Sequence, residues 1–208
     1  MNPGRFITLE GGEGVGKSTN LQYIQQLLQQ RQLEVVVTRE PGGTELAEKI
    51  RQLLLEKHAE TITENAELLL VFAARAQHIQ RVILPALQQG RWVLCDRFTD
   101  ATYAYQGGGR NMDENVIGWL ENTVQGDLRP DLTLLLDAPL DVGMSRAQQR
   151  GKLDRFESEQ RDFFERVRQA YLNRAGQDQQ RYKIIDASLP LNQVQQQIKQ
   201  ALDGLSVV

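Results

Sequence analysis

The stretch that most constrains this chain lies at residues 11–19, where glycines surround a lysine that is followed by two hydroxyl residues. It matches the pattern G-x-x-x-x-G-K-[ST], with an apolar, β-branched segment before it and leucines at helical spacing after it. A glycine loop between a strand and a helix turns its N–H groups inward around phosphates, and the helix N-terminus adds positive potential. We therefore predict that Lys17 binds the β and γ phosphates of a nucleotide and that the Ser18 hydroxyl binds Mg²⁺. The residues predicted to form this loop are Gly11, Gly12, Glu13, Gly14, Val15, Gly16, Lys17, Ser18 and Thr19.

Composition places the chain among ordinary globular proteins. Its 208 residues are 40% hydrophobic and 25% charged, which is enough for one large domain with a sizeable core. The net charge of −3 and the lack of a basic stripe argue against nucleic acid as the main partner. The N-terminus does not resemble a signal peptide and no apolar run reaches the length of a membrane span, so we expect a cytoplasmic protein with no membrane partner.

Cysteine and histidine usage gives no sign of a metal centre or a disulfide. The single cysteine, Cys95, excludes an internal disulfide, and its apolar neighbours indicate core packing rather than a reactive thiol. His58 and His78 lie far apart without metal-ligand spacing, so we interpret both as surface or helix residues.

Short apolar segments alternate with helical patterns along the chain. Because strands that alternate with helices form parallel sheets covered on both faces, we predict an α/β protein. The expected fold is a P-loop NTPase three-layer α/β/α arrangement, with a five-stranded parallel sheet flanked by helices, in a single domain over residues 1–208. The predicted strands are Phe6–Leu9, Glu34–Thr38, Trp92–Asp96, Leu132–Asp137 and Lys183–Asp186.

Polar segments follow several of these strands, and right-handed crossovers bring such segments to one edge of the sheet. We expect the phosphate loop, residues 39–43, Asp96-Arg97 and the segment after Asp186 to meet in one crevice. An aspartate at a second strand end typically holds Mg²⁺ through water, so Asp96 is a predicted metal residue and Arg97 a predicted phosphate clamp. The alternative is a salt bridge at the strand end. Arg51, on the next helix, is compatible with a surface role or a ligand role.

Two segments carry side chains suited to a flat base. A helical pattern from residue 65 to 89 places Phe72 and Arg75 on one face, where they can stack on a base and hydrogen-bond it. Spacing alone nevertheless favours a core phenylalanine and a surface arginine. Pro85 is expected to kink this helix or to end its regular part. Within residues 99–110, hydroxyl, amide and aromatic side chains precede a run of three glycines. These side chains indicate a small-molecule surface beside the crevice.

Helices are also predicted at residues 142–149 and 191–205, and the first of them leads into a basic cluster around Gly151. An exposed basic face has the same composition, but after a phosphate loop the cluster is better interpreted as a lid that closes positive charge over phosphates. Its members are Arg146, Arg150, Lys152 and Arg155.

Together these motifs resemble those of the bacterial thymidylate kinases, a family of nucleoside-monophosphate kinases, over nearly the whole chain. The phosphate loop alone is a weak guide to substrate, whereas the set is highly specific. The matching motifs are the loop with an acid inside it (Glu13), Thr38-Arg-Glu-Pro-Gly-Gly-Thr44, Phe72-Ala-Ala-Arg75, Asp96-Arg97-Phe98, Ala104-Tyr-Gln-Gly-Gly-Gly-Arg110, Arg129-Pro-Asp-Leu132 and the basic lid Arg146–Arg155.

The resemblance implies the reaction ATP + dTMP → ADP + dTDP with Mg²⁺, and a homodimer formed through helices on one side of the sheet. It implies that Glu13 faces the sugar 3′-hydroxyl of dTMP, because a carboxylate inside a phosphate loop is repelled by phosphates. It also implies that Tyr105 lies under the sugar and that Arg75 hydrogen-bonds the thymine. The remaining residues assigned to dTMP, whose binding region spans about residues 39–75, are Arg39, Arg51, Phe72, Arg97, Thr102 and Gln106.

The resemblance assigns catalysis to fixed cations. Lys17 and Arg97 would hold phosphates in the crevice, and Arg150 and Arg155 would reach the transferred phosphoryl group from a lid at about residues 146–160. The base of ATP would lie between Arg146 at the root of the lid and the segment after residue 186.

The chain departs from the family pattern in two places. Many relatives carry the base-stacking phenylalanine four residues before the arginine, where this chain has Val71, whereas Phe72 is three before it. Some relatives, notably eukaryotic ones, carry an arginine inside the phosphate loop. Here the variable loop positions Gly12, Gly14 and Val15 are neutral, so the lid must supply the catalytic charge.

Other functions remain open at the level of the sequence. A kinase of another nucleoside monophosphate, or of a deoxynucleoside, would use the same loop, and the deoxynucleoside kinase would need a base for the 5′-hydroxyl. A nucleotide-dependent switch would need N-K-x-D and D-x-x-G motifs, which the chain lacks. A structural ATP-binding subunit without turnover is disfavoured by the lid and by the second-substrate residues.

Overall fold

The computed structural model describes residues 4–148, 154–157 and 159–205. Five strands form one sheet in the order β2-β3-β1-β4-β5, and all neighbouring strands are parallel. The prediction of a five-stranded parallel sheet is confirmed, and each predicted strand overlaps an observed one. The strands are β1 (Phe6–Gly11), β2 (Val35–Arg39), β3 (Trp92–Asp96), β4 (Leu132–Asp137) and β5 (Tyr182–Asp186).

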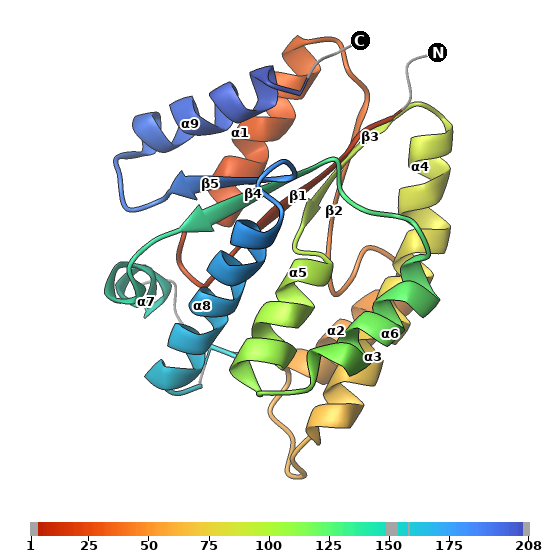
Figure 1. Ribbon diagram of the computed structural model, residues 1–208. Coiled ribbons are helices and arrows are strands. Elements are labelled where there is room, and N and C mark those ends of the chain that lie inside the picture. Colours follow the sequence, from red (N-terminus) through yellow and green to blue (C-terminus); the bar gives the residue numbers. More distant parts are fainter. Residues whose placement is uncertain (1–3, 149–153, 158, 206–208) are drawn as a thin grey trace.

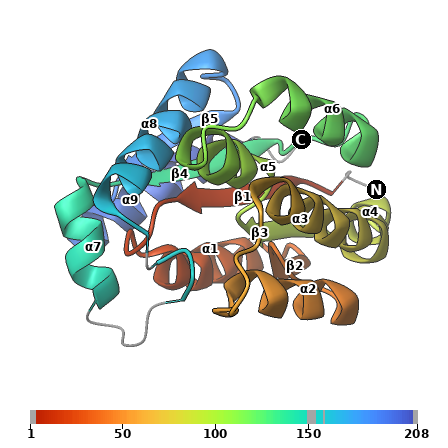
Figure 2. The same cartoon turned by 90° about the horizontal axis from the view of Figure 1, so that it is seen from below.

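Helices cover both faces of the sheet, which gives the three layers expected from the alternating pattern (Figures 1 and 2). One face is covered by α1 (Lys17–Gln30) and α9 (Leu191–Asp203), and the other by α4 (Leu84–Gln88), α5 (Thr99–Thr102) and α8 (Arg161–Gln177). None of the helices in the described ranges is long and apolar enough to span a membrane. The other helical segments are α2 (Glu45–Leu55), α3 (Glu64–His78), η1 (Ile79–Ile83), η2 (Tyr103–Gly109), α6 (Glu114–Gln125) and α7 (Leu140–Gln148).

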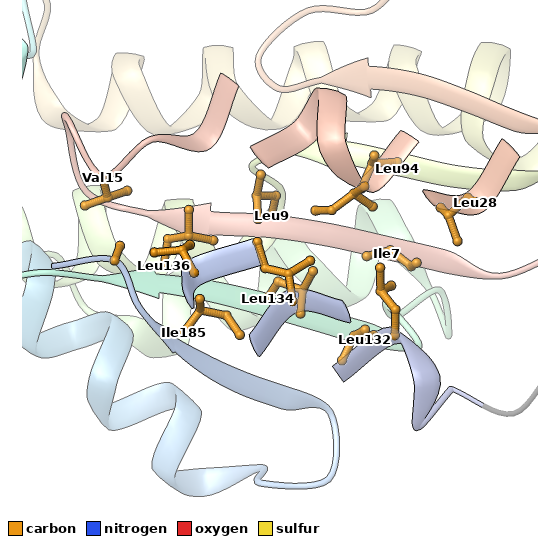
Figure 3. Packing of buried hydrophobic residues seen from close by; sticks show 14 of the residues in the cluster. Ile7, Leu9, Val15, Leu28, Leu94, Leu132, Leu134, Leu136 and Ile185 are labelled. Atoms are coloured by element: carbon orange, nitrogen blue, oxygen red, sulfur yellow. The ribbon is translucent and has the colours of Figure 1, made fainter. Parts of the chain in front are cut away.

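The core follows from the two-residue period of the central strand. In β1, Ile7 and Leu9 face the layer of α1 and α9, where they pack with the leucines of β4 shown in Figure 3. Phe6 points to the opposite face and joins a second apolar cluster with Cys95. Cys95 is fully buried, and burial raises the pKa of its thiol well above the ordinary value, which confirms its interpretation as a core residue.

The long helical pattern of residues 65–89 is interrupted where Pro85 predicts an interruption. α3 ends at His78, the wider π-helical turn η1 follows, and α4 resumes with Pro85 in its first turn. Because proline has no N–H group and its ring clashes with the carbonyl four residues earlier, the widened turn accommodates it without a break in the helix.

The glycine run at residues 107–109 does not form a ligand surface; it is a contact site for α8. It continues the π-helical segment η2, against which α8 packs. A Cβ atom on Gly108 would lie 2.6 Å from Cβ of Ala170, and one on Gly109 would lie 2.5 Å from the Phe163 ring. The glycines therefore allow two helices to approach closely, and only the residues before them remain available to a ligand.

Candidate active site

The phosphate loop links β1 to α1 at the carboxyl edge of the sheet. Gly14 and Gly16 have φ values of 69° and 89°, in the left-handed region that favours glycine. Gly11 has a φ of 136°, and a Cβ atom there would lie 2.3 Å from the carbonyl oxygen of Leu136. No described side chain caps the first turn of α1, and that turn carries no acid, so its N–H groups and its dipole remain available to an anion.

Lys17, the first residue of α1, folds its side chain back over the loop. Its Nζ donates to the carbonyl oxygens of Gly11 at 3.1 Å and Gly12 at 2.7 Å. Burial, followed by the positive charge of Arg97, lowers the pKa of Lys17 to about 8, against the opposing effect of nearby carboxylates. Within the described part of the chain the ammonium pairs with carbonyl oxygens and not with a carboxylate, which suits it to receive phosphate oxygens.

A cavity of about 490 Å³ opens beside the loop. Three of the four segments expected to converge line it, namely the loop, the turn after β2 and the end of β3. The fourth segment, after β5, does not line the cavity within the described residues. It contacts Arg146, which does line the cavity and whose Nη1 donates to the carbonyl oxygen of Ala187 at 2.9 Å. The lining side chains outside the loop include Glu40, Pro41, Arg51, Leu54, Leu55, Val71, Arg75, Asp96, Arg97, Phe98, Ala101, Thr102, Tyr105, Gln106, Arg146, Asp154, Phe156 and Glu157.

Arg97 lies on the wall of this cavity, where its backbone, the ring of Tyr105 and the carboxylate of Glu13 hold it. Its φ of 66° is left-handed, and its N–H donates to the carbonyl oxygen of Leu9 at 3.0 Å. The guanidinium lies 4.7 Å from the centroid of the Tyr105 ring and donates to Glu13 Oε1 at 2.5 Å. Tyr105 also donates to that oxygen, at 2.7 Å. Glu13 therefore accepts from Arg97 and from Tyr105, which were both predicted to bind the second nucleotide.

Asp96 ends β3 on the cavity wall, as the strand pattern predicts. Its Oδ1 is buried and has no hydrogen-bond partner within the described part of the chain. A buried carboxylate oxygen without a donor is costly unless a ligand or an ordered water satisfies it. In residues 4–148, 154–157 and 159–205, no group of three or more His, Cys, Asp or Glu side chains is arranged to hold a metal by itself.

Arg75 also lines the cavity and is almost fully buried. Its Nε donates to Glu40 Oε2 at 2.7 Å and its Nη2 to the Thr102 hydroxyl at 2.9 Å. Its Nη1 is buried and meets no hydrogen-bond acceptor among the described residues. The arginine therefore presents an unused donor in a site that also carries a phosphate loop.

Comparison with known proteins identifies the family. The model of the thymidylate kinase family matches residues 9–198. The chain is 60% identical over 202 residues to the thymidylate kinase of Pseudomonas entomophila (strain L48), covering 97% of this chain and 96% of that protein. It is 56% identical to the thymidylate kinase of Alcanivorax borkumensis, with 97% of each chain covered. The crystal structure of thymidylate kinase from Ehrlichia chaffeensis superimposes with a TM-score of 0.78 at 34% identity, covering 97% of this chain and 99% of that chain.

The chain belongs to the thymidylate kinase family. It is therefore an enzyme of ATP-dependent phosphoryl transfer, and its fold is that of the P-loop NTPases. Most side chains selected from the sequence lie together in its cavity. They are residues Glu13–Thr19 of the loop with Arg51, Arg75, Asp96, Arg97, Thr102, Tyr105, Gln106 and Arg146. Gly11 and Gly12 line a smaller cavity under the same loop.

Phe72, which was predicted from the sequence to stack on the base, lies behind the cavity wall in this structure. It packs with Leu68, Tyr103 and Ile117 in a buried cluster and is absent from the described wall of the thymidylate kinase cavity, where Val71 lies instead. The Arg75 guanidinium lies 4.8 Å from the centroid of the Phe72 ring, which therefore supports the arginine from behind. One residue along a helix turns a side chain by about 100°, and this rotation separates wall from core.

Two arginines predicted to bind substrate are engaged elsewhere. Arg39 is exposed, donates to Glu48 at 2.7 Å and does not line the cavity within the described residues. Arg155 donates to the buried Glu67 at 2.6 Å and to the carbonyl oxygen of Leu54 at 2.7 Å. Glu67 is buried and also accepts from Arg110 and Gln106, so in this structure Arg155 joins a buried polar cluster and anchors residues 154–157 to α2 and α3. Arg150, the other predicted lid cation, lies outside the described residues.

Several residues of the site were not predicted from the sequence. Glu10 is fully buried below the loop, where it accepts from the Phe98 N–H at 2.7 Å and from the Tyr171 hydroxyl at 2.8 Å. Tyr171 comes from α8, which the sequence patterns did not single out. An acid inside an apolar strand was the one available signal, because an unpaired carboxylate is rarely buried. His78 lies in a helix, but it is fully buried rather than at the surface.

The depressed pKa of Lys17 leads to a prediction for nucleotide binding. At about pH 8.5 the free enzyme holds Lys17 mostly deprotonated, and phosphates placed against Nζ raise its pKa, so ATP binding should take up roughly half a proton or more. Calorimetric titrations in two buffers of different ionisation enthalpy measure this uptake. In Lys17→Arg the guanidinium stays charged, and the uptake should fall by the amount that Lys17 contributes. Equal uptake in both proteins would contradict the assignment.

Proposed function

We propose that this protein transfers the γ-phosphoryl group of ATP to dTMP, giving ADP and dTDP. The observation that carries the proposal is that one cavity is lined by a phosphate loop with Lys17, by Arg97, and by Arg75, whose buried Nη1 has no acceptor among the described residues. A phosphate loop positions the donor nucleotide, and an arginine with a free N–H positions a base carbonyl. Arg97, on the wall of the same cavity, is suited to the phosphate of the second nucleotide. Membership of the thymidylate kinase family supports this choice of substrates.

Positioning and charge are the catalytic factors in this proposal. The acceptor is a phosphate whose second pKa is near 6, so about nine-tenths of it is already dianionic at neutral pH and no general base is needed. Lys17 and Arg97, which line one cavity, neutralise the approach of two anions. Arg150, from a lid at about residues 146–160, is proposed to add charge on the transferred group. The base of ATP is placed against Arg146 and the segment after residue 186, which the hydrogen bond from Arg146 to the carbonyl oxygen of Ala187 holds together.

Binding of dTMP is assigned to the side of the cavity formed by residues 39–75 and 97–106. Arg75 donates to the thymine carbonyl, with Thr102 and Gln106 beside it, and Arg51 and Arg97 hold the phosphate. The sugar lies on Tyr105, with Glu13 toward its 3′-hydroxyl. Support for this placement comes from the hydrogen bonds that already link Tyr105, Glu13 and Arg97 into one surface.

The residues present fit Mg²⁺. Asp96 offers a buried carboxylate oxygen without a donor, and Ser18 offers the hydroxyl that follows the loop lysine. Magnesium is usually held by one or two protein oxygens together with phosphate and water, so a small donor set is sufficient. When bound, the ion supplies charge neutralisation on the β and γ phosphates.

A coupled assay of ADP release tests the proposed function. The acceptors are dTMP, dUMP, the ribonucleotide of thymine and thymidine. We expect dTMP to be the best acceptor and thymidine to give no measurable turnover, because the cavity supplies cations for an acceptor phosphate and no group assigned as a base for a hydroxyl. Highest activity with thymidine would overturn the proposal in favour of a deoxynucleoside kinase.

We also propose that the protein is a homodimer. We expect it to lie in the cytoplasm, where ATP is available as the phosphoryl donor. Apolar side chains that are exposed in one chain gather on α2, α3 and α6, which pack next to each other along one side of the molecule (Figure 2). Exposed apolar patches of this kind mark interaction surfaces. These side chains are Leu46, Leu53, Leu69, Val116 and Trp119, the last being 66% exposed.

Trp119→Glu is expected to convert a dimer of two 23.6 kDa chains into a monomer, because it places a charge in the apolar surface at its most exposed side chain. Sedimentation equilibrium measures the mass. Leu191→Glu on α9 is the matched control, since Leu191 is also exposed but lies on the other face of the sheet. A monomeric parent protein, or a Trp119→Glu variant that stays dimeric, would contradict this interface.

A further inference from the structure

His78 forms a buried hydrogen-bonded chain that the proposed mechanism does not use. It is the last residue of α3, one turn after Arg75, and no part of its side chain reaches solvent. Its Nδ1 lies 2.9 Å from Glu40 Oε1, and its Nε2 lies 2.7 Å from the Thr38 hydroxyl. Glu40 in turn binds Arg75 through its second oxygen. The chain therefore runs from Thr38 on β2, through His78 and Glu40, to Arg75 on the cavity wall.

The direction of each hydrogen bond in this chain follows from its chemistry. Glu40 faces a guanidinium, so its carboxylate is an acceptor only, and His78 Nδ1 must carry the proton that joins them. In the neutral ring Nε2 then accepts from the Thr38 hydroxyl. This is the less common tautomer of histidine, with the proton on Nδ1, and it is fixed because Glu40 accepts from Nδ1 while the Thr38 hydroxyl donates to Nε2.

Backbone geometry shows that the space around the imidazole is shaped for it. Gly43 has a φ of 85°, and a Cβ atom there would lie 2.5 Å from His78 Cδ2 and 2.7 Å from the Thr38 hydroxyl oxygen. The turn after β2 therefore closes on the ring at van der Waals distance. Because the ring has no room to rotate, it holds the orientation of the Glu40 carboxylate.

The orientation of Glu40 decides which donors of Arg75 remain free. With Oε1 held by His78, only Oε2 binds Arg75, at Nε, while Nη2 donates to Thr102 and Nη1 is left without an acceptor. Without the imidazole, Oε1 is free to accept from Nη2, in the side-on pairing that a carboxylate and a guanidinium favour. That pairing competes with Thr102 and turns Nη1 away from its present direction.

We propose that His78, acting through Glu40, is a positioning residue that holds the free Nη1 donor of Arg75 in its present orientation at the cavity wall and thereby sets which nucleobase the enzyme accepts. The inference rests on the proposed function, in which Arg75 faces the base of the second nucleotide. Arginine has donors only, so it pairs with the carbonyl at position 4 of thymine or uracil and leaves the amino group of cytosine unpaired. A site built to make a hydrogen bond rejects an analogue that cannot make it by large factors.

Kinetic discrimination between dTMP and dCMP tests the proposal in the whole enzyme. His78→Leu keeps an apolar filling but removes the donor to Glu40. We expect its KM for dTMP to rise about tenfold with kcat changed less than about threefold, and the ratio of kcat/KM for dTMP over dCMP to fall at least about tenfold. His78→Asn returns an N–H near the position of Nδ1 and should recover most of the ratio. His58→Leu, at the exposed histidine, should leave it unchanged.

Two outcomes overturn the inference. One is a folded His78→Leu protein whose unfolding midpoint falls while its KM and base discrimination stay at parent values, because the ring is then only core packing. The other is a ¹⁵N spectrum of the parent protein in which Nε2 rather than Nδ1 carries the proton of His78. If His78→Leu does not fold, Thr38→Val removes the hydrogen bond between Thr38 and His78 Nε2 with little change of volume. We then expect a smaller fall in the ratio of kcat/KM for dTMP over dCMP. The ¹⁵N measurement needs no turnover, so it separates failure of this chain from failure of the dTMP assignment.

Discussion

Arg97→Ala is expected to lower kcat by about 10³-fold or more, because a single arginine that stabilises charge in phosphoryl transfer is worth that much in rate. The Arg97 side chain lies on the cavity wall, in contact with the loop acid Glu13 and with the aromatic ring of Tyr105. Lys17 lines the same cavity. The free energy of unfolding should change by no more than about 2 kcal/mol, because the Arg97–Glu13 pair is partly exposed to solvent and Glu13 keeps its bond from Tyr105.

Steady-state kinetics with saturating ATP and dTMP, together with urea unfolding, measure the two effects of Arg97→Ala separately. Arg31→Ala is the matched control, since Arg31 also pairs with a carboxylate, that of Asp203, but on the face of the sheet covered by α1 and α9. It should keep parent turnover. Turnover of Arg97→Ala within about tenfold of the parent would remove Arg97 from the catalytic charges.

Glu10→Gln is expected to change how stability depends on pH. Burial, followed by the negative charge of Asp100, raises the pKa of Glu10 from 4.5 to about 7, against the hydrogen bonds from Tyr171 and Phe98. Between those pH values the folded protein retains the proton and the unfolded chain has lost it. The contribution of Glu10 is therefore fully present below about pH 4.5 and is lost as pH rises through 7, at a cost of roughly 3 kcal/mol.

Glutamine cannot ionise and keeps an oxygen that accepts from the Phe98 N–H, so the variant should gain on the parent by about that amount between pH 5 and pH 8. Urea unfolding of both proteins at the two pH values measures the difference. Glu45→Gln, at an exposed acid paired with Lys49, should follow the parent at both. Parallel pH profiles for Glu10→Gln and the parent would show that Glu10 is ionised in the fold throughout this range.

Local patterns were enough to predict the sheet and the donor side of the site. Hydrophobic period and glycine placement identified the phosphate loop, and the segments Trp92–Asp96 and Leu132–Asp137 were predicted with their observed bounds. Asp96 and Arg97 followed, because parallel strands bring their carboxyl ends to one edge whatever the strand order is. The interruption at Pro85 was equally local, since it depends on one missing N–H group.

Contacts between distant segments decided the rest. The strand order β2-β3-β1-β4-β5 depends on which helices share a face, and no local pattern contains that information. Arg155 pairs with Glu67, a buried carboxylate 88 positions earlier in the chain that Arg110 also contacts. The glycine run faces α8 because Phe163 and Ala170 come within clash distance of it.

The sequence by itself determined that this protein has a phosphate loop, a parallel sheet with Asp96 and Arg97 at its active edge, and membership of the thymidylate kinase family, since each is written in spacing over a few residues or in shared motifs. Only the tertiary structure decided that Val71 and not Phe72 lines the cavity, that Arg39 faces solvent, and that His78 is buried against Glu40. The reason is physical: a side chain's role depends on the partners that packing brings to it, and most of those partners lie far away along the chain.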